Sequence, residues 1–364
     1  MTARTILLNP GPVTLTERVR RALTEGDWCH REPEFAALVQ GINAALIRVH
    51  PALAMDYESV LLTGSGTAAV EGMLAAFAPR ERTTLVLANG VYGERMARML
   101  AAQGRPVETL RHEWAAPLDL PHIEQHLAAH PEVSHIAVVQ HETTTGRLND
   151  LQALAAVARR CGVQLLVDAV SSFGAEELLG REWNVAALAA TANKCLHGVA
   201  GLSFVLARRE LWTVPPTSTG SVYFDLHAYH RAQHADGFSP FTQAVQVAFA
   251  LREALAEHAE SGGTVARRQL YRRRAETVYA ALGQLGVTTL LAPAEYSVVL
   301  WSYRLPAGMT YLRLHDALKQ EGFVIYAGQG HLAPDVFRIA HMGDIGADDL
   351  ARLTAALSAA IRPR

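Results

Sequence analysis

From about residue 59 to residue 209, short apolar runs alternate with segments that have a helical pattern of apolar residues. The apolar runs are SVLLTG, TTLVLANG, HIAVVQHE, VQLLVDAVSS and LSFVLARR, and the segments between them include TAAVEGMLAAFA, VYGERMARMLAAQG and DLQALAAVARRCG. Runs that are apolar on both faces are typical of strands buried in a parallel sheet, where a helix joins each strand to the next. The pattern therefore predicts an α/β fold with a parallel sheet and helices on its faces.

The pattern changes after about residue 210. A polar connection leads to two long helical stretches, FTQAVQVAFALREALAEHAE and TVARRQLYRRRAETVYAALGQL, which Gly262 and Gly263 separate. The remainder contains the strand-like runs VVLWSYRL, FVIYAG and VFRIAHM and helical patterns around 310–320 and 347–361. We expect a large α/β domain over residues 16–255 and a small αβ domain formed by residues 1–15 and 256–364.

Composition excludes several classes of protein. Half of the 364 residues are hydrophobic, and 33 basic side chains against 35 acidic ones give a net charge of -2. This balance argues against a disordered chain and against a nucleic-acid partner. The apolar runs are too short to span a bilayer, and Asn9, Pro10 and Pro12 interrupt the one at the N-terminus. Three scattered cysteines form neither a disulfide framework nor a zinc motif, so we expect a soluble, cytoplasmic protein without a metal or a membrane partner.

The use of lysine points to a chemical role for one residue. Only two of the 33 basic residues are lysines, Lys194 and Lys319. Lys319 lies near the end of an amphipathic helical pattern, as a solvated residue would. Lys194 lies among small polar residues in ATANKCLHG, and a lysine amine, unlike an arginine, can lose its proton and form an imine.

Polar residues follow several predicted strands, where the ligand of an open α/β sheet binds. In LLTGSGTAAVEG, the residues Ser65, Gly66 and Thr67 lie between a strand and a helix, which suits a phosphate group. A plain capped turn is the alternative for this segment. Asp168 ends the apolar run LLVD, where a structural hydrogen bond is the alternative to a ligand contact. A phosphate-binding turn, a buried aspartate and an imine-forming lysine together predict a pyridoxal 5'-phosphate site.

The order of motifs carries a family resemblance. GSGT, NGVYGERM, HETTTG, DAVSSFG, TANKCLHG and FRIAHMGDI follow the opening LLNPGPVTLTERV. This order resembles the class V, fold-type I aminotransferases, and within them the group that acts on 2-aminoethylphosphonate. The resemblance covers nearly the whole chain. It implies a mostly parallel seven-stranded sheet with a smaller C-terminal αβ domain, and a homodimer with active sites at its interface.

The resemblance also implies an activity and its catalytic residues. The enzyme would move the amino group of 2-aminoethylphosphonate to pyruvate, giving phosphonoacetaldehyde and alanine, in ping-pong order through a Schiff base of Lys194. Lys194 would also transfer the proton at the substrate, and Asp168 would pair with the pyridine nitrogen of the cofactor.

The same resemblance assigns binding residues. Ser65, Gly66, Thr67 and Asn193 would hold the cofactor phosphate, Tyr92 would stack on the ring and Thr144 would contact its polar edge. Thr242 corresponds to a threonine that crosses to the cofactor of the partner subunit, although Gln243 and Ala244 replace the prolines that usually follow it.

Three further residues are implied at the substrate. Arg338 would bind the acidic group of the substrate, with a structural ion pair as the alternative. The loop of Gly11 and Pro12 would line the same pocket. Arg31 is a second candidate contact to the phosphonate, with a surface arginine as the alternative.

Other readings remain open or are rejected. An alanine or serine glyoxylate aminotransferase and an enzyme for another aminophosphonate share the same core residues. A lyase or cysteine desulfurase of the same fold is disfavoured, because a desulfurase needs a later cysteine as sulfur acceptor and none follows Cys195. A non-enzymatic relative is disfavoured because Lys194 is retained. HIEQH at 122–126 lacks the glutamate that a metalloprotease has directly after its first histidine, so it is interpreted as a solvated helix face.

Overall fold

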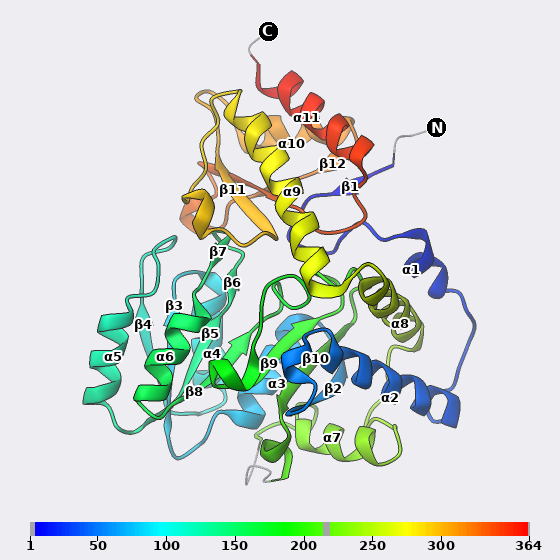
Figure 1. Cartoon of the computed structure of the whole chain (residues 1–364), viewed down its shortest axis with the longest axis vertical. Coiled ribbons are helices and arrows are strands. Elements are labelled where there is room, and N and C mark those ends of the chain that lie inside the picture. The colour runs from blue at the N-terminus through cyan, green and yellow to red at the C-terminus, as the bar shows by residue number, and fades with distance from the viewer. Residues whose placement is uncertain (1–3, 214–218, 363–364) are drawn as a thin grey trace.

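The large domain is built on one seven-stranded sheet, seen in a computed structural model that describes residues 4–213 and 219–362 (Figure 1). In order across the sheet the strands are β2 (Tyr57–Thr63), β10 (Leu202–Arg208), β9 (Val185–Thr191), β8 (Gln164–Asp168), β5 (Val133–Val139), β3 (Thr83–Ala88) and β4 (Val107–Arg111). The mostly parallel sheet of the predicted fold class is confirmed.

One strand departs from the expectation of a purely parallel sheet. The run LSFVLARR forms β10, which is antiparallel to both of its neighbours, β2 and β9. Only residues 192–201 connect β9 to β10, which is shorter than the crossover of a dozen or more residues that a parallel connection needs. This short connection is the loop that carries Lys194.

Two strands were not among the predicted runs. The sequence of β9, VAALAAT, is mostly alanine, which has a low preference for strands, although every residue in it is buried. The sequence of β4, VETLR, is polar and partly exposed because β4 is an edge strand. Their places are fixed by pairing with β8 and β3.

Helices cover both faces of this sheet, as predicted. Apolar side chains of α2 (Pro33–Arg48), α5 (Leu120–Ala129), α6 (Leu151–Arg160) and α8 (Val245–Glu260) form one core with the sheet. Those of α3 (Gly66–Phe77), α4 (Val91–Ala102) and α7 (Leu226–Ala235) form the core on the opposite face. A short α1 (Glu17–Ala22) packs on α8.

The small domain combines the two ends of the chain. β11 (Leu300–Arg304), β14 (Val336–Ala340) and β13 (Tyr326–Ala327) form an antiparallel sheet, and β1 (Ile6–Leu7) pairs in parallel with β12 (Phe323–Val324). Three helices, α9 (Gly263–Gly283), α10 (Tyr311–Gln320) and α11 (Ala347–Ile361), pack around a core of their own with these strands. Figure 1 shows α9 running from the large domain into the small one. The predicted boundary at 255/256 falls within α8, and the domain limits stay a prediction.

The remaining elements are short. They are the β6–β7 hairpin (His141–Glu142 and Arg147–Leu148) and the 3-10 turns η1 (Pro51–Leu53), η2 (Gly180–Trp183), η3 (Arg209–Thr213), η4 (Pro293–Glu295) and η5 (Gly330–Leu332).

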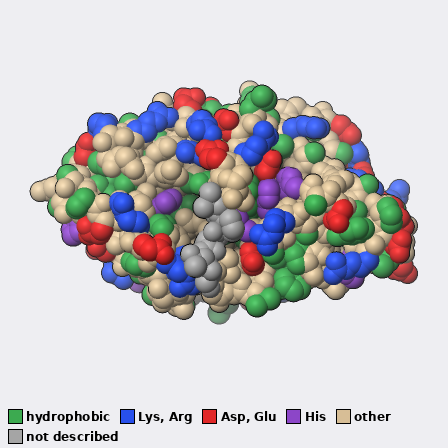
Figure 2. All heavy atoms as spheres, turned by 90° about the horizontal axis from the view of Figure 1, so that it is seen from below, with side chains coloured by type: hydrophobic (Ala, Val, Ile, Leu, Met, Phe, Trp, Pro, Cys, Tyr) green, Lys and Arg blue, Asp and Glu red, His purple; other side chains and the backbone are tan. Residues whose placement is uncertain are grey.

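On the face shown in Figure 2, acidic and basic side chains are interspersed, in keeping with the small net charge. Within the described ranges, each helix is too short or too polar to cross a bilayer.

Candidate active site

The carboxyl ends of the parallel strands bring the predicted cofactor residues to one edge of the sheet. Gly64 to Thr67 follow β2, Asn89 to Tyr92 follow β3, Asp168 ends β8, and Lys194 follows β9. Thr67, Tyr92 and Asp168 line one cavity together with Arg95 and Val170. Residues from three separate strand ends therefore converge as the sequence predicted.

Lys194 lies largely buried in the β9–β10 loop. Its Nζ donates a hydrogen bond to the Pro10 carbonyl oxygen of the N-terminal segment. Burial lowers the pKa of the Lys194 amine to about 8, while the nearby carboxyl of Asp168 opposes this shift. A larger minority of the amine is therefore neutral near pH 7 than for an ordinary lysine, which favours its role as a nucleophile and proton acceptor.

Asp168 is buried at the end of β8, where its Oδ1 accepts a hydrogen bond of 2.9 Å from the Val170 N–H. Burial raises the pKa of its carboxyl to about 6, and the charges of Arg95 and Lys194 lower it less than burial raises it. A buried carboxyl of this kind is stabilised by a cationic partner, such as a protonated ring nitrogen.

The turn between β2 and α3 leaves room for an anion. Ser65 is the N-cap of α3, but its exposed side chain makes no capping hydrogen bond. At Gly66, a Cβ atom would lie 2.7 Å from a methyl carbon of Val170, so only glycine allows the backbone to approach this closely. Thr67 Oγ1 accepts a hydrogen bond of 3.3 Å from Arg95, which places a cation beside the predicted phosphate group.

Arg95 is a residue that the sequence analysis missed. Its guanidinium lies over the Tyr92 ring, 4.7 Å from the ring centroid. Tyr92 and Arg95 are three positions apart on α4, so both side chains lie on the same face of the helix. That spacing within the motif NGVYGERM could have identified Arg95.

Thr144 is held by a second missed residue, Glu142. The carboxylate of Glu142 accepts hydrogen bonds from the Thr144 hydroxyl (2.6 Å) and the Thr144 N–H (3.1 Å). The Thr144 hydroxyl oxygen in turn accepts from the Val91 N–H at 3.1 Å. Complete burial raises the pKa of Glu142 to about 7. Glu142 thus fixes the orientation of Thr144. The acidic residue in the motif HETTTG is the sequence feature that could have identified Glu142.

Arg338 lies on β14 of the small domain and is only 1% exposed. Its guanidinium donates hydrogen bonds to the carbonyl oxygens of Ala327 (2.8 Å) and Thr143 (2.6 Å) and to Gln329 Oε1 (3.1 Å). All three acceptors are uncharged, and among the described residues no carboxylate forms an ion pair with this guanidinium, although the Glu142 carboxyl acts on it electrostatically. The contact with Thr143 also places Arg338 directly beside the HETTTG motif.

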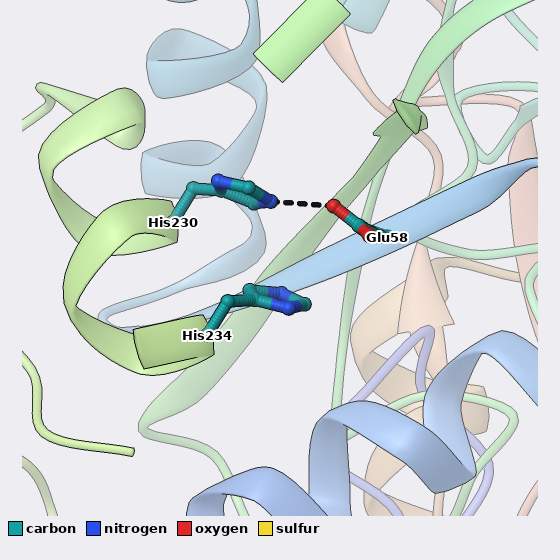
Figure 3. Close-up of side chains that lie close together, drawn as sticks. All are labelled: Glu58, His230 and His234. Carbon is teal, nitrogen blue, oxygen red and sulfur yellow. Dashed lines mark hydrogen bonds and ion pairs between the residues drawn. The ribbon is translucent and has the colours of Figure 1, made fainter. Parts of the chain in front are cut away.

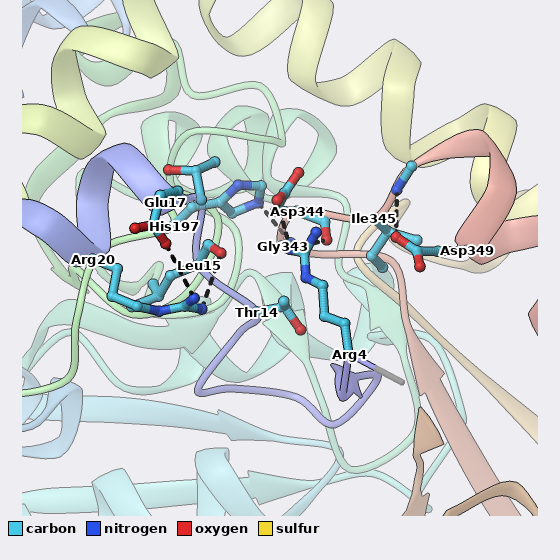
Figure 4. A network of polar contacts seen from close by, with 12 residues as sticks. Arg4, Thr14, Leu15, Glu17, Arg20, His197, Gly343, Asp344, Ile345 and Asp349 are labelled. Atoms are coloured by element: carbon cyan, nitrogen blue, oxygen red, sulfur yellow. Dashed lines mark hydrogen bonds and ion pairs between the residues drawn. The ribbon is translucent and has the colours of Figure 1, made fainter. Parts of the chain in front are cut away.

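The N-terminal segment closes over the lysine. A Cβ atom on Gly11, whose φ is +112°, would lie 2.6 to 2.9 Å from the side-chain atoms of Lys194. Polar contacts hold this segment in place, including the hydrogen bond from the Asp344 N–H to the Thr14 carbonyl oxygen and the ion pair of Arg4 with Asp344 (Figure 4). Gly11 therefore lies against Lys194, and its expected role in the substrate pocket stays a prediction.

The other candidates have different surroundings. Asn193 Oδ1 accepts a hydrogen bond of 2.9 Å from the Thr191 hydroxyl. Thr242 is exposed just before α8, where Ala244 and Gln243 bond to the side chain of Thr63. Arg31 is exposed and donates to the carbonyl oxygens of Ser239 and Pro240, so the structure places it against the loop that precedes Thr242 rather than beside Arg338. The binding roles of these three residues stay predictions.

Comparison with known proteins identifies the family. Residues 36–342 match the family model described as aminotransferase class-V. The chain belongs to the class V aminotransferases. It is 34% identical over 359 residues to a 2-aminoethylphosphonate–pyruvate transaminase of Pseudomonas aeruginosa, covering 98% of this chain and 96% of that protein. A protein of the same name from Aeromonas hydrophila is 36% identical over 93% of this chain and 90% of its own length.

Solved structures agree with the fold of this family. An alanine–glyoxylate aminotransferase from Nostoc superimposes with a TM-score of 0.92 at 24% identity, over 100% of this chain and 96% of that one. An aspartate aminotransferase from Thermus thermophilus gives a TM-score of 0.88 at 26% identity, over 98% of this chain and 99% of that one. The predicted fold-type I architecture is therefore confirmed by these structures, and the aminotransferase class by the family match and the relatives described above.

Proposed function

We propose that this class V aminotransferase uses pyridoxal 5'-phosphate to move the amino group of 2-aminoethylphosphonate to pyruvate. The observation that carries the proposal is the convergence of Lys194, Asp168 and Arg338. They supply an amine with a lowered pKa, a buried carboxyl and a guanidinium that is oriented by neutral acceptors. The names of the relatives that align over nearly the whole chain support the same pair of substrates.

The residues present fit the cofactor. The close approach at Gly66, the free hydroxyl of Ser65 and the cation of Arg95 beside Thr67 suit its phosphate, and Asp168 suits its pyridine nitrogen. When bound here, pyridoxal 5'-phosphate would supply a carbonyl that condenses with amines and a ring that accepts electrons from the substrate carbon.

The side chains of the chain divide the remaining work. The lowered pKa of Lys194 lets its Nζ accept a proton from the substrate carbon and return it, because both protonation states are populated near neutral pH. Asp168 holds the ring nitrogen in its charged form. Arg338 binds the phosphonate of the amine donor and the carboxylate of the oxo acid in turn, since its fork suits both groups.

We also propose that the enzyme is a homodimer that works in the reducing cytoplasm. Thr242 is exposed on a segment tied to Thr63 at the end of β2, which suits a side chain that crosses to a partner subunit. All three cysteines are free thiols, as expected in a reducing compartment.

An alanine or serine glyoxylate aminotransferase is the second candidate, because one neighbour in structure carries the name alanine–glyoxylate aminotransferase. A single-turnover absorbance assay with the cofactor-loaded protein distinguishes the two. Rapid conversion of the cofactor by 2-aminoethylphosphonate, reversed by pyruvate, is the expected result. Conversion only by alanine or serine would move the enzyme to the glyoxylate group, and no conversion by any of these or by phosphonoalanine would overturn both.

Replacing Arg338 by alanine tests the proposed anion site. We expect kcat/KM to fall for both substrates, because the anion would be left without its buried partner. The loss should correspond to about 2 to 5 kcal/mol of transition-state binding energy. Arg313, which is exposed on α10 in the same domain, provides a control whose replacement leaves the rate unchanged. Equal kinetics of R338A and R313A would remove Arg338 from the site.

A further inference from the structure

A second polar cluster lies at the edge of the large sheet where the parallel strands begin, whereas the active site lies where they end. Glu108 is near the start of β4, His126 and His130 are at the end of α5, and Glu132 directly precedes β5. We call these four residues the edge cluster. They lie at the amino ends of their strands, whereas Lys194 and Asp168 lie at the carboxyl ends.

The edge cluster brings imidazole and carboxylate groups together. His126 Nε2 lies 2.9 Å from Glu108 Oε2, and His130 Nδ1 lies 3.9 Å from Glu108 Oε1. Glu132 Oε1 lies 3.0 Å from His130 Nδ1. Because the two histidines are four positions apart, they share one helix face, and their rings stack with centroids 4.2 Å apart.

These spacings suit a metal ion. Ligands about 2.0 to 2.1 Å from a tetrahedral zinc ion lie about 3.3 Å from one another, and the three distances of the edge cluster bracket that value. Glu108, His126 and His130 each offer a ligand atom within 4.8 Å of the others. Small side-chain rotations would therefore bring the donors into the coordination shell.

The charge of the cluster also favours a dication. Glu108 and Glu132 supply two carboxylates, and within the described ranges both form ion pairs only with the two histidines. The nearby Arg82 guanidinium is bonded to backbone carbonyl oxygens, including that of Glu132. With neutral imidazoles, the edge cluster carries two negative charges that a divalent ion would neutralise.

We propose that Glu108, His126 and His130 form a binding site for one divalent transition-metal ion, with Glu132, which contacts His130, as the candidate fourth ligand and with zinc as the best match to this donor set. The ion would join the end of α5 to the edge strand β4, at the amino ends of the strands rather than at the carboxyl ends where Lys194 and Asp168 lie. The proposal departs from the sequence-based expectation of a metal-free protein, and it uses His126 together with His130 rather than with His122. The proposal is independent of the transaminase function.

A similar cluster elsewhere in the chain provides a matched control. His230 Nε2 of α7 lies 2.6 Å from Glu58 Oε2, with His234 one turn further along the helix (Figure 3). Here Arg209 pairs with the other carboxylate oxygen of Glu58 at 3.1 Å, and His234 Nε2 is bonded to the Ser59 carbonyl oxygen. A single carboxylate whose charge is already offset by Arg209 offers much weaker attraction to a cation.

The test is zinc binding to cofactor-loaded protein after treatment with a chelator and gel filtration. Zinc chloride is titrated in competition with a chromogenic chelator for the wild type, for H126Q/H130Q and for H230Q/H234Q. We expect about one zinc ion per chain in the wild type and in H230Q/H234Q, and affinity at least about ten-fold weaker in H126Q/H130Q. Zinc should raise the Tm of the first two proteins and not of the third.

The comparison of variants distinguishes zinc bound at this site from zinc bound by the exposed Cys29 or by the cofactor, because Cys29 and the cofactor are present in every variant. The Tm without zinc shows whether H126Q/H130Q is folded, and E108Q supplies an independent variant of the same site. Equal zinc affinity of the wild type and H126Q/H130Q would overturn the proposal. So would loss of zinc from H230Q/H234Q alone, or no zinc binding by the wild type.

Discussion

At the scale of single residues, burial sets the chemistry of the site. Lys194 and Asp168 are ordinary side chains whose pKa values move toward neutrality, to about 8 and about 6, because each is removed from water. The two shifts leave both groups able to change protonation state near neutral pH, which suits proton transfer.

Replacing Lys194 by alanine should abolish turnover, because no other lysine lies near Asp168. Covalent attachment of pyridoxal phosphate, measured by borohydride reduction and mass spectrometry, should be lost together with activity. Lys319→Ala is the matched control, since Lys319 is the other lysine of the chain and lies in the last turn of α10. Undiminished turnover in K194A would contradict the proposed mechanism.

Glu142 should impose a pH dependence on stability. Its pKa is about 7 in the folded protein against 4.5 for an ordinary glutamate, so the folded state binds its proton more tightly. The free energy of unfolding therefore falls as the pH rises from about 4.5 to about 7, by up to about 3 kcal/mol. The variant E142Q lacks this loss.

Chemical denaturation of the cofactor-free protein across this pH range checks the prediction. The free energy of unfolding of E142Q minus that of the wild type should increase with pH, whatever its value at low pH. Parallel curves for the two proteins would show that Glu142 does not titrate in this range.

At the scale of elements, short connections position the reacting groups. The β9–β10 loop carries Lys194, and Nε2 of His197 in the same loop accepts a hydrogen bond from the Gly343 N–H (2.8 Å) and lies 2.5 Å from the Tyr271 hydroxyl oxygen. Burial lowers the pKa of His197 well below its usual value, which keeps the ring neutral and able to accept. The lysine loop is thereby attached to the small domain.

The N-terminal segment should be sensitive to a single methyl group. Gly11→Ala would place a Cβ within 2.9 Å of the Lys194 side chain and should reduce cofactor attachment and turnover by displacing that side chain. Gly26 also has a positive φ, +141°, but a Cβ there would meet nothing within 4 Å. Gly26→Ala therefore introduces the same kind of backbone strain without a clash, so it should lower Tm slightly and leave the activity unchanged. Equal activity of the two variants would mean that the segment does not restrain Lys194.

At the scale of the whole molecule, the site combines both domains. Arg338 comes from the small domain, Asp168 and Lys194 come from the large one, and Gly11 comes from the chain that crosses between them. The proposed contribution of Thr242 adds a second subunit. A motion of one domain or subunit relative to the other would therefore change the substrate site directly.

Mixing K194A with T242A tests whether Thr242 acts across subunits, provided that each variant alone has lost its activity. If it does, a heterodimer of K194A and T242A contains one intact site, made of Lys194 from one chain and Thr242 from the other. Equal mixing after reversible dissociation should then give about a quarter of the wild-type activity, because half of the dimers are mixed and each has one of two sites. If the activity of the mixture does not exceed that of the separate variants, Thr242 acts in the site of its own subunit. Gel filtration of each variant checks that it still forms a dimer.

Much of the protein could be predicted from local sequence. Apolar runs such as LLVD and helical patterns such as that of α3 are decided by burial and periodicity, which neighbouring residues report. The motifs around Asp168 and Lys194 likewise predicted the cofactor and the aminotransferase class. Alanine-rich β9 and polar β4 were missed because their pairing partners, rather than their own residues, make them strands.

Only the tertiary structure decided which distant groups meet. The reversal of β10, the Arg95 cation beside Thr67 and the pairing of His126 with Glu108 depend on contacts between separate segments of the chain. Burial, which sets the pKa values of Lys194 and Asp168, is also a property of the packed whole. The sequence by itself determined the elements and the identity of the reacting groups, because these follow from side-chain chemistry and local periodicity. Packing decided their protonation and orientation, because both depend on neighbours supplied by other elements.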